Sequence, residues 1–181
     1  MEPRSHVVVT SIGTDRPGIV ADLSGWILAH DGNIEASRMS QLGGEFATII
    51  LVSGDEGLAA RLEQSRAGFE SAHHLAVATK PVTGAPQPPG EPLLRYSLRA
   101  TSLDHPGIVN QVAALLRQHS INIVSASTRT TPAPFTGAPI FQFQMEVDIP
   151  GTMPLTRFRE ALRVLGDREN IDLMLAPLPD A

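Results

Sequence analysis

The segment that decides the fold of this chain occurs twice. Residues Thr14–Val20 read TDRPGIV, and 89 residues further on Leu103–Val109 read LDHPGIV. At the same offset, Gly32–Ile34 (GNI) returns as Ile121–Ile123 (INI). Each Asp-x-Pro-Gly segment follows a strand-like apolar run and opens an amphipathic stretch, and each Asn begins the next strand-like run. Two copies in one register predict two domains of one type. Because a turn and a strand start repeat best, the pattern favours paired binding sites over a catalytic centre.

Length and composition fit two small domains joined by a linker. The 181 residues accommodate two units of about 80 residues each. The stretch 81–92, PVTGAPQPPGEP, is too rich in Pro and Gly for a helix or an inner strand, and its prolines predict a semi-rigid spacer. We therefore predict a first domain at residues 1–80, a linker at 81–92 and a second domain at 93–181.

Composition also excludes several classes of function. The net charge of −5 argues against direct nucleic-acid binding, and the lack of cysteine excludes disulfides, thiolate metal sites and cysteine nucleophiles. No run is long enough to cross a bilayer and no leader precedes the first strand, so we expect a cytoplasmic protein without a membrane partner. His73, His74 and His105 lack a third ligand at recognisable spacing, so no metal site is predicted. No nucleophile motif occurs, so neither enzyme activity nor a cofactor is expected.

The hydrophobic periodicity gives the same order of elements in both halves. In the first half we predict a strand at 6–12, a helix whose first turn holds Pro17 and which Gly32 ends, a hairpin of 33–42 with 45–52, a helix from Leu58 to Phe69 and a strand at 75–79. The second half repeats this order. The order β-α-β-β-α-β is that of ferredoxin-like α+β units, which have antiparallel sheets with helices on one face.

The Asp-x-Pro-Gly turns can be interpreted in two ways. Amides at a helix N-terminus can hold a carboxylate, glycine allows close approach to the backbone, and Asp15 or Asp104 could accept bonds from an ammonium group. An α-amino acid carries both of those charges. Alternatively, each Asp caps its own helix. Likewise, Asn33 and Asn122 are either ligand contacts or turn residues that tolerate unusual backbone angles.

Topology predicts which residues can share a ligand. A right-handed β-α-β crossover makes the first two strands of a unit parallel, so Asp15 and Asn33 should lie at opposite ends of their sheet. If two units pair antiparallel through their second strands, the Asp15 turn comes near Asn122 and the Asp104 turn comes near Asn33. Exposed second-strand edges also favour a homodimer or an intimate pair of units.

The element order, the Asp-x-Pro-Gly-Ile-Val turn and the Asn-Ile start of the second strand resemble the ACT domain, a small regulatory module that commonly binds amino acids. The resemblance covers nearly the whole chain as two units. Residues 131–141, TPAPFTGAPIF, look like the Pro-x-Thr-Gly-x-Pro-hydrophobic-Phe segment of the family of the glycine cleavage system transcriptional repressor, whose members are free-standing tandem ACT proteins.

The resemblance implies regulation through a protein partner. It implies a sensor of a small, glycine-like amino acid that acts on a transcription regulator, with negative regulation of amino-acid metabolism genes as the outcome. The alternative is an orphan regulatory subunit of an enzyme of amino-acid metabolism. The ligand contacts that the family implies fall on the two turns and strand starts: Gly13, Asp15, Pro17, Gly18, Asn33, Ser102, Asp104, Pro106, Gly107 and Asn122.

The segment Thr131–Pro139 is predicted to be an ordered protrusion rather than a strand, because it is rich in Pro and Gly. Its prolines reduce the entropy lost on ordering a surface segment, so we interpret it as a partner-docking or dimer-contact loop; the alternative is a simple insertion. The contact residues that this interpretation names are Pro134, Thr136, Gly137 and Pro139.

Overall fold

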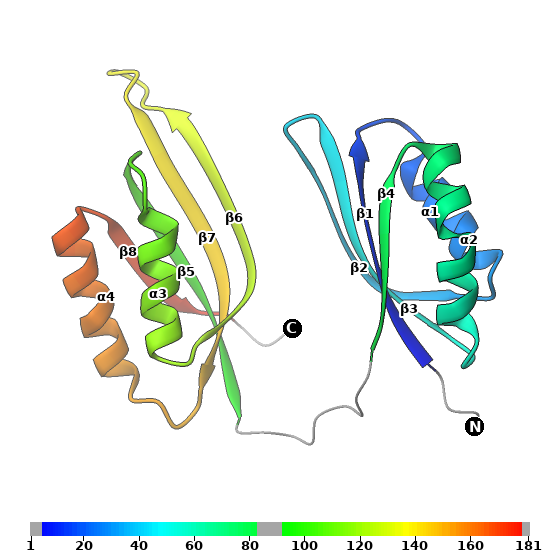
Figure 1. Cartoon of the computed structure of the whole chain (residues 1–181). Helices are drawn as coiled ribbons and strands as arrows, with labels where there is room; N and C mark the ends of the chain where they lie inside the picture. The colour runs from blue at the N-terminus through cyan, green and yellow to red at the C-terminus, as the bar shows by residue number, and fades with distance from the viewer. Residues whose placement is uncertain (1–4, 83–91, 179–181) are drawn as a thin grey trace. The chain divides into compact units, whose positions relative to one another are not determined.

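The computed structural model of the chain describes residues 5–82 and 92–178. The chain divides into two compact units, residues 1–86 and 87–181. Each unit has the order β-α-β-β-α-β, which confirms the predicted fold class (Figure 1). Of the predicted linker 81–92, residues 83–91 lie outside the described residues.

The first unit is a four-stranded antiparallel sheet with two helices on one face. Its sheet order is β2-β3-β1-β4, so β2 and β4 are the edge strands. Antiparallel pairing of β1 with β3, and of β3 with β2, makes β1 and β2 parallel. The elements are β1 (Ser5–Thr14), α1 (Ile19–Leu28), β2 (Asn33–Leu42), β3 (Glu45–Gly54), α2 (Leu58–His73) and β4 (Ala76–Pro81).

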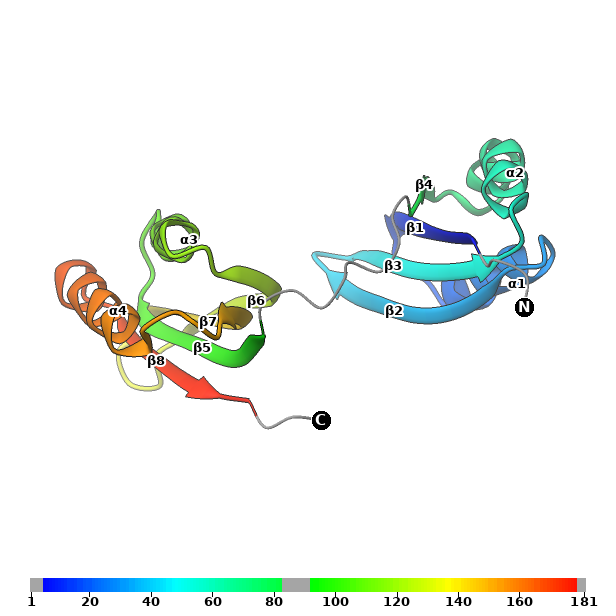
Figure 2. The same ribbon diagram turned by 90° about the horizontal axis from the view of Figure 1, so that it is seen from below.

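The second unit repeats this architecture, with the sheet order β6-β7-β5-β8 and with β6 and β8 at the edges. Its two helices lie on one side of the sheet (Figure 2). The elements are β5 (Leu93–Leu103), α3 (Ile108–Gln118), β6 (Asn122–Pro132), β7 (Pro139–Pro150), α4 (Leu155–Glu169) and β8 (Asp172–Pro177).

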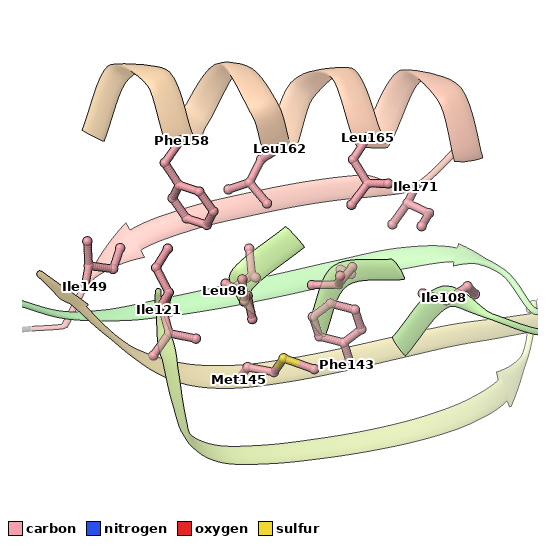
Figure 3. Close-up of a cluster of buried hydrophobic side chains, with 14 residues drawn as sticks. Leu98, Ile108, Ile121, Phe143, Met145, Ile149, Phe158, Leu162, Leu165 and Ile171 are labelled. Carbon is pink, nitrogen blue, oxygen red and sulfur yellow. The ribbon is translucent and has the colours of Figure 1, made fainter. Parts of the chain in front are cut away.

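Alternation along the central strands builds each core. In β7, Phe143, Met145 and Val147 are buried toward the helices, whereas the residues between them face away, as period-2 alternation requires. The α4 side chains Phe158 and Leu162 pack down onto this face of the sheet (Figure 3). Because the apolar face of the sheet meets the apolar sides of the helices, one apolar core forms between the two layers.

The core of the first unit contains the chain's one tryptophan. Trp26 on α1 is 8% exposed and stacks on Phe69 of α2 at a ring-centroid distance of 4.7 Å. Its indole Nε1–H donates to Ser65 Oγ at 2.9 Å. A buried indole with a satisfied N–H is well suited to packing, so Trp26 joins the two helices.

Helix α1 ends earlier than the sequence predicts. Its last residue is Leu28, and Asp31 takes the left-handed conformation at φ 61°. Gly32 follows this turn instead of ending the helix. A Cβ on Gly32 would lie 2.8 Å from side-chain atoms of Ile27 and Val52, so glycine is needed there for close packing. The equivalent turn of the second unit uses Ser120 at φ 55°.

Candidate functional site

The Asp-x-Pro-Gly segment of each unit is a turn that is tied to the tip of the hairpin. The Asp15 N–H donates to the carbonyl of Gly44 at 2.9 Å, and the Asp104 N–H donates to the carbonyl of Pro139 at 2.9 Å. Gly18 and Gly107 then adopt φ of 97° and 99°, a left-handed conformation that favours glycine. The helices begin directly afterwards, so the same local geometry is built twice.

The structure does not support the capping alternative for the two aspartates. Gly18 and Gly107 occupy the N-cap positions, and neither helix has a side-chain cap. Asp15 and Asp104 lie three residues before these caps, and among the described residues their carboxylates form no hydrogen bond or ion pair. Pro17 also precedes α1 and is not in its first turn, because Gly18 must first turn the backbone. Both helix N-termini and both carboxylates therefore face solvent.

A cluster of titratable side chains holds the Asp-x-Pro-Gly turn of the first unit against its two helices. Arg16 donates to Asp22 Oδ2 at 2.7 Å and to the carbonyl of His73 at 3.3 Å, and His73 Nδ1 lies 3.1 Å from the same Asp22 oxygen. The hydrogen bond from Arg16, followed by the charge of His73, lowers the pKa of Asp22 below its usual range. The cluster joins the turn, α1 and the end of α2.

The second unit replaces this cluster with a different one. Gln111 donates to Glu169 at 3.0 Å and accepts from Arg168 at 3.3 Å. The hydrogen bond from Gln111, followed by a second one that Arg168 Nε donates to Glu169 Oε1 at 2.6 Å, lowers the pKa of Glu169. His105 stands where Arg16 does in the first unit, and its Nδ1 lies 3.2 Å from the carbonyl of Pro106. Neither cluster was predicted from the sequence, because their members come from segments that lie far apart in the chain.

Gly13 and Ser102 occupy equivalent strand positions in different surroundings. A Cβ on Gly13 would lie 2.7 Å from Leu75 Cδ2 and 2.9 Å from the carbonyl oxygen of His74. The structure thus gives Gly13 a packing role. Ser102 is 8% exposed, and its Oγ has no hydrogen-bond partner among the described residues. It borders a cavity of about 910 Å³ that is lined largely by α4 and β8.

Asn33 and Asn122 are the first residues of β2 and β6, at the far ends of the sheets from the aspartates. Asn33 pairs with Ser53, whereas Thr14, next to Asp15, pairs with Glu45. Glu45 and Ser53 are eight residue steps apart along β3, which separates the two ends by about 27 Å at 3.4 Å per residue. The second unit has the same separation, since Asn122 pairs with Asp148 and Leu103 with Ile140. No single unit can bring its own Asp and Asn onto one small ligand.

Each asparagine lies beside a hydrogen-bonded pair of titratable side chains and a β-bulge. His6 Nε2 lies 3.2 Å from Glu35 near Asn33, and the register shifts between Ile34 and Ala36. In the second unit, Arg95 donates to both carboxylate oxygens of Asp148 at 2.9 and 3.1 Å, which raises the pKa of Arg95. The two strand starts therefore share a position but differ in the side chains that pair beside them.

The predicted protrusion is shorter than expected. β6 continues to Pro132 and β7 begins at Pro139, which pair with each other, so only residues 133–138 form the turn. Proline is tolerated at these strand ends because the two prolines form the last pair before the turn, so its missing backbone N–H costs little of the strand pairing. The Ala133 N–H donates to the carbonyl of Ala138 at 2.8 Å, and Gly137 has φ 69°.

The tip of this turn presents its side chains to solvent. Phe135 is fully exposed, and Pro134, Thr136 and Gly137 are exposed around it. Through the Asp104–Pro139 bond the turn adjoins the Asp-x-Pro-Gly segment of the same unit. No local pattern in the sequence links these two features, since Asp104 and Pro139 stand 35 positions apart in the chain.

Residues 5–82 and 92–178 contain no group of three metal-ligating side chains close enough to hold an ion. None of the helices in that part of the chain has the length and apolarity needed to cross a bilayer.

Comparison with known proteins identifies both units. Models of the ACT domain match residues 5–79 and residues 96–167. A glycine cleavage system transcriptional repressor from Escherichia coli (strain K12) is 27% identical over 165 residues, which cover 91% of this chain and 86% of that protein. The crystal structure of an unknown protein from Galdieria sulphuraria is 32% identical, with a TM-score of 0.80 and coverage of 97% of this chain and 99% of that one. The crystal structure of a candidate glycine cleavage system transcriptional repressor shares the fold at 21% identity, with a TM-score of 0.72 and coverage of 98% and 99%.

Proposed function

Because this chain belongs to the ACT-domain family and carries two such domains in tandem, we propose that it is a non-enzymatic regulator that binds a small amino acid and acts on a partner protein. The similarity to a glycine cleavage system transcriptional repressor supports a role in the negative regulation of amino-acid metabolism genes. On this reading the partner is a transcription regulator, the amino acid is glycine or one of similar size, and the protein works in the cytoplasm.

The observation that carries this proposal is the pair of uncapped helix N-termini. The partial positive charge and free amides at the start of α1 and α3 can hold a carboxylate. The unpaired carboxylates of Asp15 and Asp104 lie three residues before the caps and can accept bonds from an ammonium group. Each turn thus offers complementary groups for the two charges of an α-amino acid.

Each site is completed by a strand start from another unit. β2 and β6 are edge strands with nearly every residue exposed, so their unpaired backbone groups are available for strand pairing. Antiparallel pairing of two such edges brings the start of each strand to the end of the other. In the proposed sites, Asn122 joins the Asp15 turn and Asn33 joins the Asp104 turn. Ligand binding then favours the paired state, because only pairing completes the sites.

The Asp104 site is the one placed to communicate with a partner. Pro139 accepts the Asp104 N–H and ends the exposed turn at residues 133–138. A ligand that orders the Asp104 turn is therefore connected, through the Asp104–Pro139 hydrogen bond, to the turn that carries the proposed partner contacts Pro134, Thr136 and Gly137. The Asp15 turn bonds instead to Gly44, in the short Gly43-Gly44 turn.

Isothermal titration calorimetry with glycine and serine at millimolar concentration tests the proposal. Asp104→Ala and Asn33→Ala should weaken the same site, each by about 10- to 100-fold, because each removes a hydrogen bond to a charged group. Asp15→Ala and Asn122→Ala should weaken the other site. Asp172→Ala removes an exposed carboxylate on β8 and serves as the control, with unchanged binding. Failure of every amino acid to bind wild type would refute the sensing role, although a constitutive role in protein binding would survive.

A further inference from the structure

The two units differ on the sheet face that their helices leave uncovered, which we call the open face. In the first unit the open face presents Val8, Thr10 and Ile12 of β1 beside Leu51, Ile49 and Ala47 of β3. Ile12 is 50% exposed and Ile49 is 56% exposed. On the flanking strands, Ala36 on β2 and Ala76 and Ala78 on β4 continue this apolar surface.

The equivalent face of the second unit is polar. Ser97, Arg99 and Thr101 of β5 pair with Glu146, Gln144 and Gln142 of β7. These residues stand at the same sheet positions as the apolar ones of the first unit. Because fold and register are the same, the fold alone does not account for the apolar open face of the first unit. Apolar surface gathered on one sheet face marks an interaction site.

We propose that the open face of the first unit packs against the same face of a second copy of this chain. The two copies are related by a two-fold axis that runs parallel to the strands, between the facing sheets and over the gap between β1 and β3. This axis places β1 of one copy opposite β3 of the other and keeps every residue at its level along the sheet. Ile12 then lies over Ala47 of the second copy, and Ile49 lies over Thr10. Each bulky side chain meets a smaller one, as interdigitating sheet faces require.

Charges at the rim fit the same arrangement. The axis places β4 of one copy over β2 of the other. Lys80, which pairs with Val8, then faces the end of β2 that carries Glu35, and Arg38 faces Ala78 instead of another cation. Opposite charges at the rim favour this pairing and disfavour the wrong registers.

The area is sufficient for a stable dimer. Four strands at about 4.8 Å spacing and a register of about nine residues at 3.4 Å give a footprint of about 590 Å² per copy. Two copies together bury about 1,200 Å², above the roughly 1,000 Å² that a specific interface needs. The open face of the second unit is a poorer occupant, since Arg99 and Glu146 would lose hydration against an apolar surface.

Sedimentation of the full chain at micromolar concentration, without any amino acid, tests the proposal. Ile49→Arg should halve the mass of the wild-type assembly and weaken self-association at least about 100-fold, because a two-fold interface contains the change twice. Gln144→Arg introduces the same side chain at the matching position of the second unit and should leave the mass unchanged. Circular dichroism checks that both variants are folded.

The absence of cysteine allows a direct test of geometry. Ile12→Cys should give a covalent dimer with a short bis-maleimide, because facing sheets lie about 10 Å apart. Thr101→Cys, the matching position on β5, should not. A monomeric wild type, an unchanged mass for Ile49→Arg, or no cross-link at position 12 would overturn the proposal. Loss of the dimer in both arginine variants would overturn it in favour of the second unit's face as the occupant. These readouts do not depend on the proposed ligand.

Discussion

Alanine placed at two equivalent positions, Gly13→Ala and Ser102→Ala, should shift the stabilities of the two units in opposite directions. Both residues stand next to the end of the first strand of their unit and face the helices. The same new side chain therefore enters the same place in the same fold. The expected difference comes from what surrounds each position.

Gly13→Ala should destabilise the first unit. The new Cβ would lie 2.7 Å from Leu75 Cδ2, which can move, and 2.9 Å from the carbonyl oxygen of His74, which belongs to the backbone. Overpacking of this kind costs about 1–3 kcal/mol. Replacing glycine in a strand returns about 0.5–1 kcal/mol of backbone entropy. The net loss is about 1–2 kcal/mol.

Ser102→Ala should stabilise the second unit. The hydroxyl is buried and has no hydrogen-bond partner among the described residues. An unsatisfied buried polar group costs about 1–3 kcal/mol. Removing it leaves a void of only one atom, so a net gain of about 1 kcal/mol is expected. For a domain of this size, 1 kcal/mol moves the Tm by about 4–8 °C.

The chain offers a separate probe for each unit. Trp26 is its only tryptophan and lies in the core of the first unit, while its only tyrosine, Tyr96, lies in the second. Urea unfolding followed by tryptophan fluorescence should report a lower midpoint for Gly13→Ala and no change for Ser102→Ala. Far-UV circular dichroism should show a later transition of the second unit in Ser102→Ala. If both variants shift in the same direction, the argument from packing and unsatisfied polarity is wrong.

Three further predictions concern the two units separately. Gly107→Ala should destabilise the second unit by about 1–2 kcal/mol in urea unfolding, because φ is 99°, and Gly107→Asn should cost less, since Asn tolerates this region better. The pKa of Asp22 is lowered in the folded state, mainly by Arg16, so its contribution to stability is present above the unfolded pKa of about 3.9 and is lost as the pH falls through the lower folded value. Asp22→Asn should therefore show a smaller fall in the tryptophan-detected midpoint between pH 7 and pH 3 than wild type does. Phe158→Ala, at a fully buried position, should cost the second unit about 3–5 kcal/mol and leave the Trp26 transition in place.

The sequence alone was sufficient for the elements and their order. Period-2 alternation in β7, the helical stripe of α3 and the paired glycines at 43 and 44 are local signals, so each could be recognised without its neighbours in space. The repeated turn motif predicted two units of one fold. The opposite placement of Asp15 and Asn33 also followed from the β-α-β crossover, which makes the two strands parallel. These features depend on short segments and on general rules of chain topology.

Only the tertiary structure decided how the repeated motif is used. It placed glycine at both N-caps and left the aspartates unpaired, because the backbone must turn at Gly18 and Gly107 before each helix begins. It joined Asp104 to Pro139 and His73 to Asp22 across long stretches of chain. It also distinguished the two open faces, since a face is defined by the register of paired strands. Such contacts depend on which distant segments meet, and no local pattern of residues encodes that.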